Sequence, residues 1–564
     1  MSIKLIFAVI LLFGSFSLDA KASNLKEKLN TFDDDQDALN PWGDDEKADS
    51  SELLCIDKID SVQKAIRLLN QKEICKVTPS VETIFSESGI SSISEIVNKT
   101  IQSPSSQSEF KTVEASRYMV DSSFASAFLP TLELSSGSIT KSETSDKTSS
   151  KTKRYIPVPV TVSALDDPSW SFTETNTSSD PAYYAQFALT LPIYKPSLIQ
   201  TYVYYKSSGK AEAFSSTSAI DNEVETSIKD AISLWVSYKQ IKMNKLNVIA
   251  ALESLETTIG QYKIGQKAIP DIAESLSQLR TNQSELANEY ETYFSSFNSL
   301  ALQLGLKPSN LYFNPEFLKV TFLNPLLDYS QTLNSETLQE SVSKSNSVYN
   351  YLYLSSSYLD LGKSYLANYL PAVSLSLGYN YQTYNNTIKT SSCGGNWNCE
   401  LKSRENEISS SNDPSISLNF SWQFFDSGKA YYEYRSKKMT AESNFDNAVN
   451  SAYEAIESIT TDFQTQLMLE DQIDFNYSSL ASSMISYRDT LLAYKAGFSD
   501  TTSLVQRLQQ LVSARSTFLS SIQSQLDTKL SIMQTLRDGI YSDLNYFNLN
   551  YNQDLTEKLN VIND

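Results

Sequence analysis

The chain has 564 residues, contains no histidine and carries a formal net charge of −20. Without histidine the usual general base and the commonest zinc ligand are missing, so we expect no enzyme, no metal site and no cofactor. The negative charge also argues against nucleic acid as a partner, because phosphate backbones attract basic surfaces.

The first residues are typical of a signal peptide. An apolar run from Leu5 to Phe13 follows Lys4 and is too short to cross a bilayer as a helix. Ala20-Lys21-Ala22 fits the small-x-small pattern of a cleavage site, so we predict a signal peptide over 1–22 and export from the cytoplasm. No later stretch is apolar over the roughly 18 consecutive residues that a transmembrane helix needs.

An acidic extension over 23–84 follows the predicted cleavage site. Its aspartates are spaced as in a calcium-binding loop, but Ala38 stands where such loops need glycine, so we expect a solvated segment. The four cysteines fit an oxidising compartment, and we predict two local disulfides, with free thiols as the alternative. The candidate pairs are Cys55 with Cys75 and Cys393 with Cys399. Thiol titration of the denatured, non-reduced protein distinguishes the two possibilities.

The rest of the chain repeats itself. Leu129-Pro130 recurs as Leu370-Pro371, and Tyr-Lys-x-Gly begins at Tyr262 and again at Tyr494. This spacing is far longer than that of solenoid repeats and indicates that half of a fold was duplicated. We predict a first repeat over 85–325, a second repeat over 326–540 and an Asn-rich tail over 541–564.

Each repeat begins with a helix that ends at Leu-Pro. Two stretches follow in which apolar residues occupy every second position, a pattern typical of strands with two different faces. The alternating residues are Leu132 and Leu134, Phe187 to Ile193, Val373 to Tyr381, and Ile416 to Phe424. Four strands of about ten residues would be long enough to cross a bilayer, whereas the alternative is a small soluble sheet packed on a core. We expect polar surface loops over 140–182 and 382–414.

Long helices follow the strands in both repeats. Residues 197–259 and 427–490 contain almost no glycine or proline, and apolar residues recur at helical spacing from Val224 to Tyr238. A second helix returns in each repeat, and in the last one the apolar stripe runs from Leu504 to Met533. Such stripes favour packing against neighbouring helices, as in a coiled coil.

The Tyr-Lys-x-Gly motifs mark the tips of these helical hairpins, over 262–271 and 494–503. Gly265 and Gly497 stand where the first helix of each hairpin must end, and glycine tolerates the left-handed conformation that follows a helix. Pro270 suits the first turn of the returning helix.

This doubled order of helix, Leu-Pro, strand, loop, strand and helical hairpin resembles the TolC-like outer-membrane efflux protein family over about 85–540. The resemblance implies a mostly α fold with a small β part, in which long antiparallel helical hairpins form a periplasmic α-barrel. It also implies four strands per chain in a shared, trimeric, twelve-stranded outer-membrane β-barrel. Apart from the family, four strands cannot close a barrel alone, because the smallest known bacterial barrels use about eight.

The resemblance also implies a function. Family members are homotrimers embedded in outer-membrane lipid, and they serve as passive exit ducts of tripartite efflux or type I secretion systems. A periplasmic adaptor (membrane fusion) protein and an inner-membrane pump complete the assembly, and the cargo is small molecules or proteins. The competing interpretation is a periplasmic coiled-coil structural or adaptor protein without a pore, which would not behave as a detergent-extracted membrane protein.

The resemblance carries over to the tips only in part. Tyr262 and Gly265 match the first tip, and Tyr494 and Gly497 match the second, where the family's tyrosine helps to hold the entrance closed. Asp271 matches the acidic partner contributed by the first repeat. These residues are therefore our candidates for a periplasmic aperture.

Other charged residues of the family's tips are missing. Ser499 replaces an arginine, and Ser503 and Gln506 stand where known members carry an acidic pair. We expect Asp271 and Glu274 to offer a replacement acidic ring. The alternative is that both are simply a solvated first turn, favoured by the helix dipole.

Overall fold

The computed structural model describes residues 89–138, 172–314, 317, 319–393, 399–496 and 498–549. The predicted signal peptide, the acidic extension with Cys55 and Cys75, and the tail from 550 onward lie outside these residues. The described part is predominantly helical and contains one antiparallel sheet of four strands. The predicted fold class, mostly α with a small β part, is therefore confirmed. None of the described helices is long and apolar enough to cross a membrane.

The elements follow the predicted order, with a helix before each Leu-Pro, then strands, then a helical hairpin. The first half contains α4 (Ile93–Ile101), α5 (Pro104–Phe128), β1 (Thr131–Ser138), β2 (Phe172–Tyr194), α6 (Pro196–Lys263) and α7 (Ile269–Gln303). The second half contains α9 (Ser335–Ser343), α10 (Asn346–Leu366), η6 (Ala367–Tyr369), β3 (Ala372–Cys393), β4 (Cys399–Ser421), α11 (Lys429–Lys495) and α12 (Thr501–Leu536). The remaining short helices are η3 (Pro308–Asn310), η5 (Val320–Leu323), α8 (Asn324–Leu327) and η7 (Gly539–Tyr541).

The chain divides into two compact units. The hairpin unit consists of the described parts of Met1–Ala115, Lys210–Leu354 and Ser443–Asp564. The sheet unit consists of the described parts of Ser116–Gly209 and Ser355–Glu442. Each unit draws on both predicted repeats, so the repeat boundaries stay predictions.

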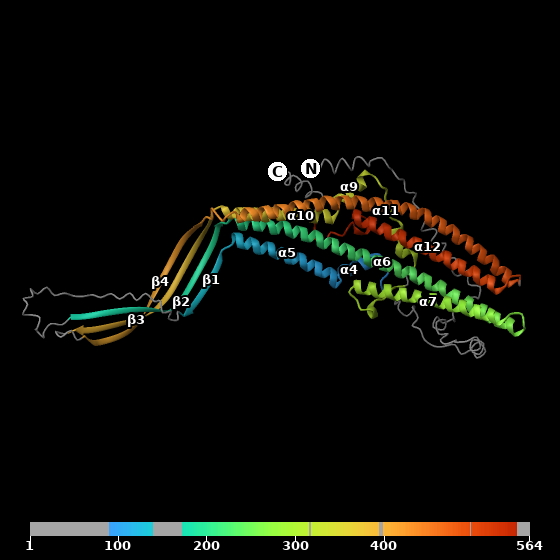
Figure 1. Ribbon diagram of the computed structural model, residues 1–564, viewed down its shortest axis with the longest axis horizontal. Coiled ribbons are helices and arrows are strands. Elements are labelled where there is room, and N and C mark those ends of the chain that lie inside the picture. The colour runs from blue at the N-terminus through green and yellow to red at the C-terminus, as the bar shows by residue number, and fades with distance from the viewer. Residues whose placement is uncertain are drawn as a thin grey trace, which may run out of the picture. The chain divides into compact units, whose positions relative to one another are not determined.

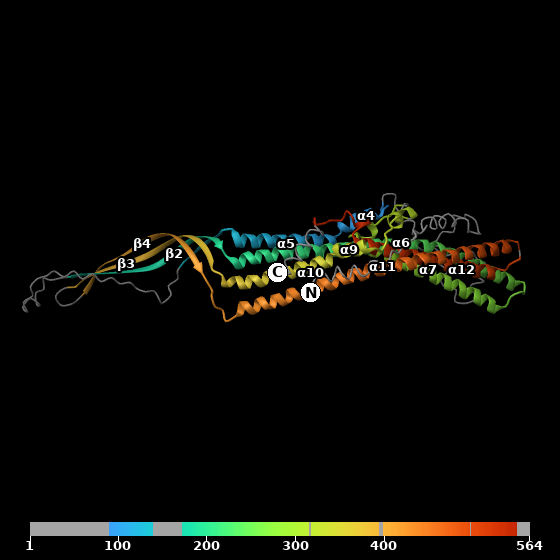
Figure 2. The ribbon, with the colours of Figure 1, turned by 90° about the horizontal axis from the view of Figure 1, so that it is seen from above.

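The hairpin unit has an extended apolar core between its helices. Here α7 lies beside α6, and α12 lies beside α11 (Figure 1, Figure 2). The apolar stripe from Val224 to Tyr238 is buried, and Trp235 is completely inaccessible. The stripe from Leu504 to Met533 on α12 is buried as well. Helical periodicity therefore located this core correctly.

A buried ion pair crosses the hairpin unit. Arg537, which follows α12 in a left-handed conformation (φ 47°), donates a hydrogen bond to Asp221 of α6. Asn346 Nδ2 of α10 donates to the same carboxylate at 3.1 Å. Burial raises the pKa of Asp221 to about 6, although the charge of Arg537 opposes the shift. The pair ties the end of α12 to α6, and loss of either partner would leave an uncompensated buried charge.

The sheet unit holds strands in the order β1-β2-β3-β4, each antiparallel to its neighbours. The strands β2 and β4 span 23 residues each and β3 spans 22, much longer than the ten we expected. Residues 172–182 of the first predicted loop (140–182) and most of the second (382–414) are therefore strand, and the loop prediction was wrong for them. Residues 140–171 lie outside the described residues. The sequences of the extensions are mostly polar and show no apolar alternation, whereas the backbone hydrogen bonds of a ladder do not depend on side-chain polarity.

Two details of the strand ends also differ from the prediction. The apolar alternation extends to Trp422 and Phe424, but β4 ends at Ser421. The pairing register of β2 shifts between Pro192 and Tyr194, so Ile193 occupies a bulge. The far ends of β3 and β4 pair Cys393 with Cys399 in register, although a disulfide between them stays a prediction.

Candidate functional site

The first hairpin tip has the geometry that its sequence predicted. Gly265 follows the end of α6 with φ +80°, and its N–H donates to the carbonyl of Tyr262 at 3.0 Å. The N–H of Gln266 donates to the carbonyl of Gln261 at 2.9 Å, so two terminal carbonyls of the helix are satisfied. The tip is exposed to solvent, and Ile264 is 69% exposed.

Asp271 has a local role at the start of α7. One of its carboxylate oxygens accepts a hydrogen bond from the N–H of Ala268 at 2.8 Å, which caps the helix, and Pro270 lies in the same first turn. Glu274 is exposed about one turn further along α7. Both observations agree with the solvated-turn alternative, and an acidic ring formed by Asp271 and Glu274 stays a prediction.

The second tip is built around a different aspartate. Asp500 precedes α12, and its Oδ1 accepts a hydrogen bond from the N–H of Ser503 at 2.8 Å. This hydrogen bonding with Ser503 lowers the pKa of Asp500, and the nearby charge of Lys267 lowers it further. Lys267 belongs to the first tip, so opposite charges of the two tips influence each other. Gly497 lies outside the described residues, and Gln506 is exposed on α12.

Tyr494 links the two hairpins. Its hydroxyl donates to Oε1 of Glu253 on α6 at 3.4 Å, a long hydrogen bond. Burial raises the pKa of Glu253, the hydrogen bond from Tyr494 lowers it, and the charge of Glu256 raises it. The acidic partner of Tyr494 in this chain is therefore Glu253, whereas Asp271 caps α7.

The layer around Glu253 contains unsatisfied polar atoms. Oε2 of Glu253 is buried without a hydrogen-bond partner among the described residues, and so is the hydroxyl of the inaccessible Tyr487. Burial raises the pKa of Tyr487, and the charge of Glu253 adds to the shift.

The sheet has two faces of opposite character. Residues paired across neighbouring strands form rows, and rows alternate between apolar and polar because successive side chains point to opposite faces. The apolar rows are Leu132, Leu189, Leu377 and Ile416; Leu134, Phe187 and Tyr379; and Leu191, Leu375 and Leu418. A polar row between them consists of Thr131, Thr190, Ser376 and Ser417.

A second exposed apolar surface follows α11. Large apolar side chains occur there in two pairs, and the members of each pair are seven residues apart, the repeat of a coiled-coil seam. They are Met468 and Phe475, which are 70% and 72% exposed, and Ile485 and Leu492, which are 63% and 58% exposed.

The described residues offer no evident metal site, since they contain no group of three or more metal-ligating acidic or cysteine side chains. Sequence reasoning overlooked two tip residues, Glu253 and Asp500. Asp500 stands three residues before Ser503, which is a recognisable helix-capping pattern. Glu253 has no such signal, because its partner Tyr494 lies 241 positions away.

Neither a protein-family model nor a curated protein sequence matches the chain. Solved structures do match, at low sequence identity. CusC, reported in terms of transmembrane channel formation, has 12% identity and a TM-score of 0.55, covering 82% of this chain and 94% of CusC. The CmeC outer membrane channel of Campylobacter jejuni has 14% identity and a TM-score of 0.56, and the match covers 83% of this chain and 89% of CmeC. The outer-membrane channel OprN has 13% identity and a TM-score of 0.54, and the match covers 83% of this chain and 96% of OprN. The chain therefore has the fold of TolC-family outer-membrane channels.

Proposed function

We propose that the protein is an outer-membrane channel, a passive exit duct through which small molecules or proteins leave the periplasm. Three copies share one barrel, each contributing its four strands, and the helical hairpins extend into the periplasm. A periplasmic adaptor protein and an inner-membrane pump supply the energy, in a tripartite efflux or type I secretion system. The duct itself carries out no catalysis.

The exposed apolar face of the sheet is the observation that carries this proposal. Ile416 is 79% exposed and Leu418 is 67% exposed, although apolar surface costs about 25 cal/mol per Å² in water. Lipid against this face removes that cost, and the polar face behind it suits a water-filled lumen. The soluble-sheet alternative needs a core under the apolar face, and these exposures argue against one.

Two further features support an assembly of several copies. The strands β1 and β4 are the edges of the described sheet, and unpaired strand edges are not tolerated in hydrocarbon. Edge pairing between copies satisfies these backbone groups. The exposed stripe that contains Met468 and Phe475 on α11 also suits a neighbouring copy. The number three follows from the similarity to the TolC-like family.

The decisive experiment compares arginine substitutions at two adjacent positions of β4. Leu418→Arg places a charge on the apolar face, and Ser417→Arg places the same charge on the polar face. A charge facing lipid near the bilayer centre costs about 2–4 kcal/mol, whereas lumen substitutions tune selectivity. We expect Leu418→Arg to reduce recovery in outer-membrane fractions. Ser417→Arg inserts normally and changes the ion selectivity of channels in planar bilayers.

Equal membrane recovery of the two variants would contradict the assignment of the faces. A wild-type chain that stays dispersed without detergent and gives no conductance would contradict the channel itself. That second result would favour the periplasmic coiled-coil protein without a pore.

A further inference from the structure

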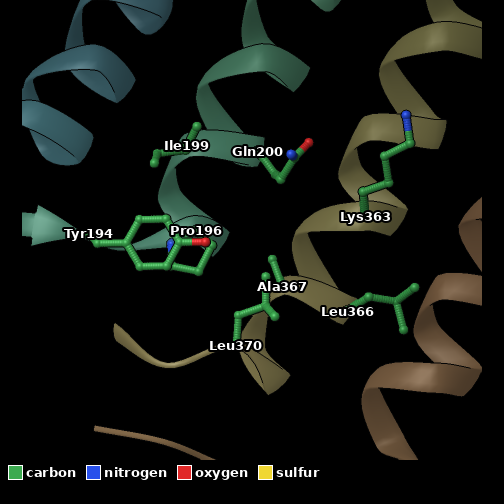
Figure 3. Close-up of a pocket in the computed structure, with 8 residues that line it drawn as sticks. All are labelled: Tyr194, Pro196, Ile199, Gln200, Lys363, Leu366, Ala367 and Leu370. Carbon is green, nitrogen blue, oxygen red and sulfur yellow. The ribbon is translucent and has the colours of Figure 1, made fainter. Parts of the chain in front are cut away.

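A groove of about 450 Å³ lies within the sheet unit, where the strands meet the helices (Figure 3). One wall is the end of β2 with the start of α6, and the other is the end of α10 with η6. Its volume falls within the range of small-molecule sites, roughly 300–1,000 Å³. The lining residues that matter here are Tyr194, Pro196, Gln200, Lys363, Ala367 and Leu370.

The groove has an apolar end and a polar end. Tyr194, Pro196 and Leu370 adjoin the strands and form the apolar end, as Figure 3 shows. Gln200 and Lys363 lie further into α6 and α10, and form the polar end. The polarity therefore changes along the direction from strand to helix, as it does from hydrocarbon to headgroup in a membrane.

The strand register connects this groove to the apolar face of the sheet. After the bulge at Ile193, Tyr194 pairs with Val373, and Val373 pairs with Phe420. Val373 lies two residues before Leu375, so this row belongs to the apolar face. The apolar end of the groove thus continues the surface that we assign to lipid.

Lys363 is the only charged residue among those that line the groove. Its Nζ lies 3.3 Å from Oδ1 of Asp360, and its side chain is 45% exposed. An ammonium group has three N–H donors, so Nζ can bind a second anion while it contacts Asp360. A long lysine side chain at the end of an apolar surface can reach a phosphate while its stem stays in apolar surroundings.

We infer that the groove holds one anionic phospholipid of the leaflet that faces the periplasm. Its phosphate contacts Lys363 and Gln200, and an acyl chain lies along Tyr194, Pro196 and Leu370. Basic pockets beside membrane-spanning segments on the headgroup side bind anionic lipids by the same chemistry. The inference rests on the proposed outer-membrane location, because that location sets the direction of the lipid.

The experiment measures lipid retention by the full-length protein in detergent. The chain is titrated with phosphatidylglycerol, and native mass spectrometry counts the lipid molecules bound per chain. Lys363→Gln is expected to weaken the tightest binding about five-fold, the contribution of one basic residue near anionic lipid. Leu370→Ser, at the opposite end of the groove, is expected to weaken it as well. Lys438→Gln is the matched control, because Lys438 is 46% exposed in the same unit and also faces an acidic residue.

Retention by Lys363→Gln equal to that of the wild type would overturn the inference. Equal weakening by Lys438→Gln would also overturn it, because the effect would then be one of overall charge. Displacement of the lipid by inorganic phosphate at matched concentration would identify a free-phosphate site instead. Lipid retention is measured independently of conductance. A chain that binds the lipid but forms no channel would therefore contradict only the proposed function.

Discussion

The hairpin unit and the sheet unit treat the same residue type in opposite ways. Trp235 in the hairpin unit is completely buried, whereas Trp422 at the end of β4 is 57% exposed. The apolar stripes on α6 and α12 are likewise enclosed, whereas Ile416, Leu418 and Phe420 on β4 are exposed. The comparison teaches that the hairpin unit buries a continuous core within a single chain, while the sheet unit leaves large apolar side chains of its strands exposed.

The difference arises from the two periodicities. Residues at helical spacing form one stripe, which a second helix of the same hairpin can cover. Residues at every second strand position form a whole face, and in the described four-stranded sheet Ile416 and Leu418 on that face stay exposed. Substitutions that are expected to affect one unit and not the other test this difference between the units.

The largest effect is expected from Trp235→Ala. Removing this buried side chain leaves a cavity in the hairpin unit, and we expect the free energy of unfolding to fall by about 3–5 kcal/mol. Denaturant unfolding followed by helical circular dichroism in detergent provides the measurement. Trp422→Ala is the matched control, since it removes an exposed side chain and one hydrogen bond, from Nε1 to the carbonyl of Tyr369 at 2.9 Å. Equal losses for the two variants would break the comparison.

The second prediction concerns a polar group in the hairpin unit, Asp527 of α12. Burial raises its pKa to about 6; the charge of Lys229 lowers this value and that of Glu225 raises it. The folded state therefore binds a proton more tightly than the unfolded state. The stability that this provides is present below about pH 4 and is lost as the pH rises through about 6.

Asp527→Asn stays neutral and avoids that loss. We expect it to stabilise the protein by up to about 3 kcal/mol at pH 7.5 relative to the wild type, and to have little effect at pH 4. Thermal unfolding at the two pH values provides the measurement. Asp489→Asn on α11 changes an exposed aspartate and serves as the control. A gain at pH 4 as large as that at pH 7.5 would contradict the explanation.

The smallest effect is expected at the tips. Tyr494→Phe removes the hydrogen bond to Glu253, worth about 0.5–1.5 kcal/mol, so the ratio of closed to open channels should fall about two- to ten-fold. Single-channel recording provides the measurement, with drug resistance of cells as a second readout. Tyr262→Phe at the other tip is the control. Unchanged recordings and unchanged resistance for Tyr494→Phe would refute a role in closure.

The sequence predicts those parts of the fold whose residues repeat with a period. The buried stripes on α6 and α12 and the inner halves of the strands belong to this class, because burial or lipid selects apolar residues at fixed steps. Gly265 was also predictable, since its left-handed conformation (φ +80°) favours glycine. The outer halves of β2, β3 and β4 were not, because their sequences are mostly polar and contain no apolar period to detect.

The candidate site was predictable only where its chemistry is local. Asp500 could have been found from its capping pattern. Asp271 was singled out through the family resemblance, and its local hydrogen bond agrees with the alternative, a first turn favoured by the helix dipole. The contact between Tyr494 and Glu253 depends on how two hairpins pack, and no local pattern contains that information.

The outer strands of the described sheet, β1 and β4, each have one edge without a partner strand in that sheet. Until β1 and β4 meet partner strands, they offer hydrogen bonds to any extended polypeptide, including a misfolded neighbour. In the proposed assembly, productive encounters require other copies of the chain, and their frequency rises with the local concentration of such copies. In that assembly the rate of delivery therefore affects the yield in addition to the stability of one folded copy.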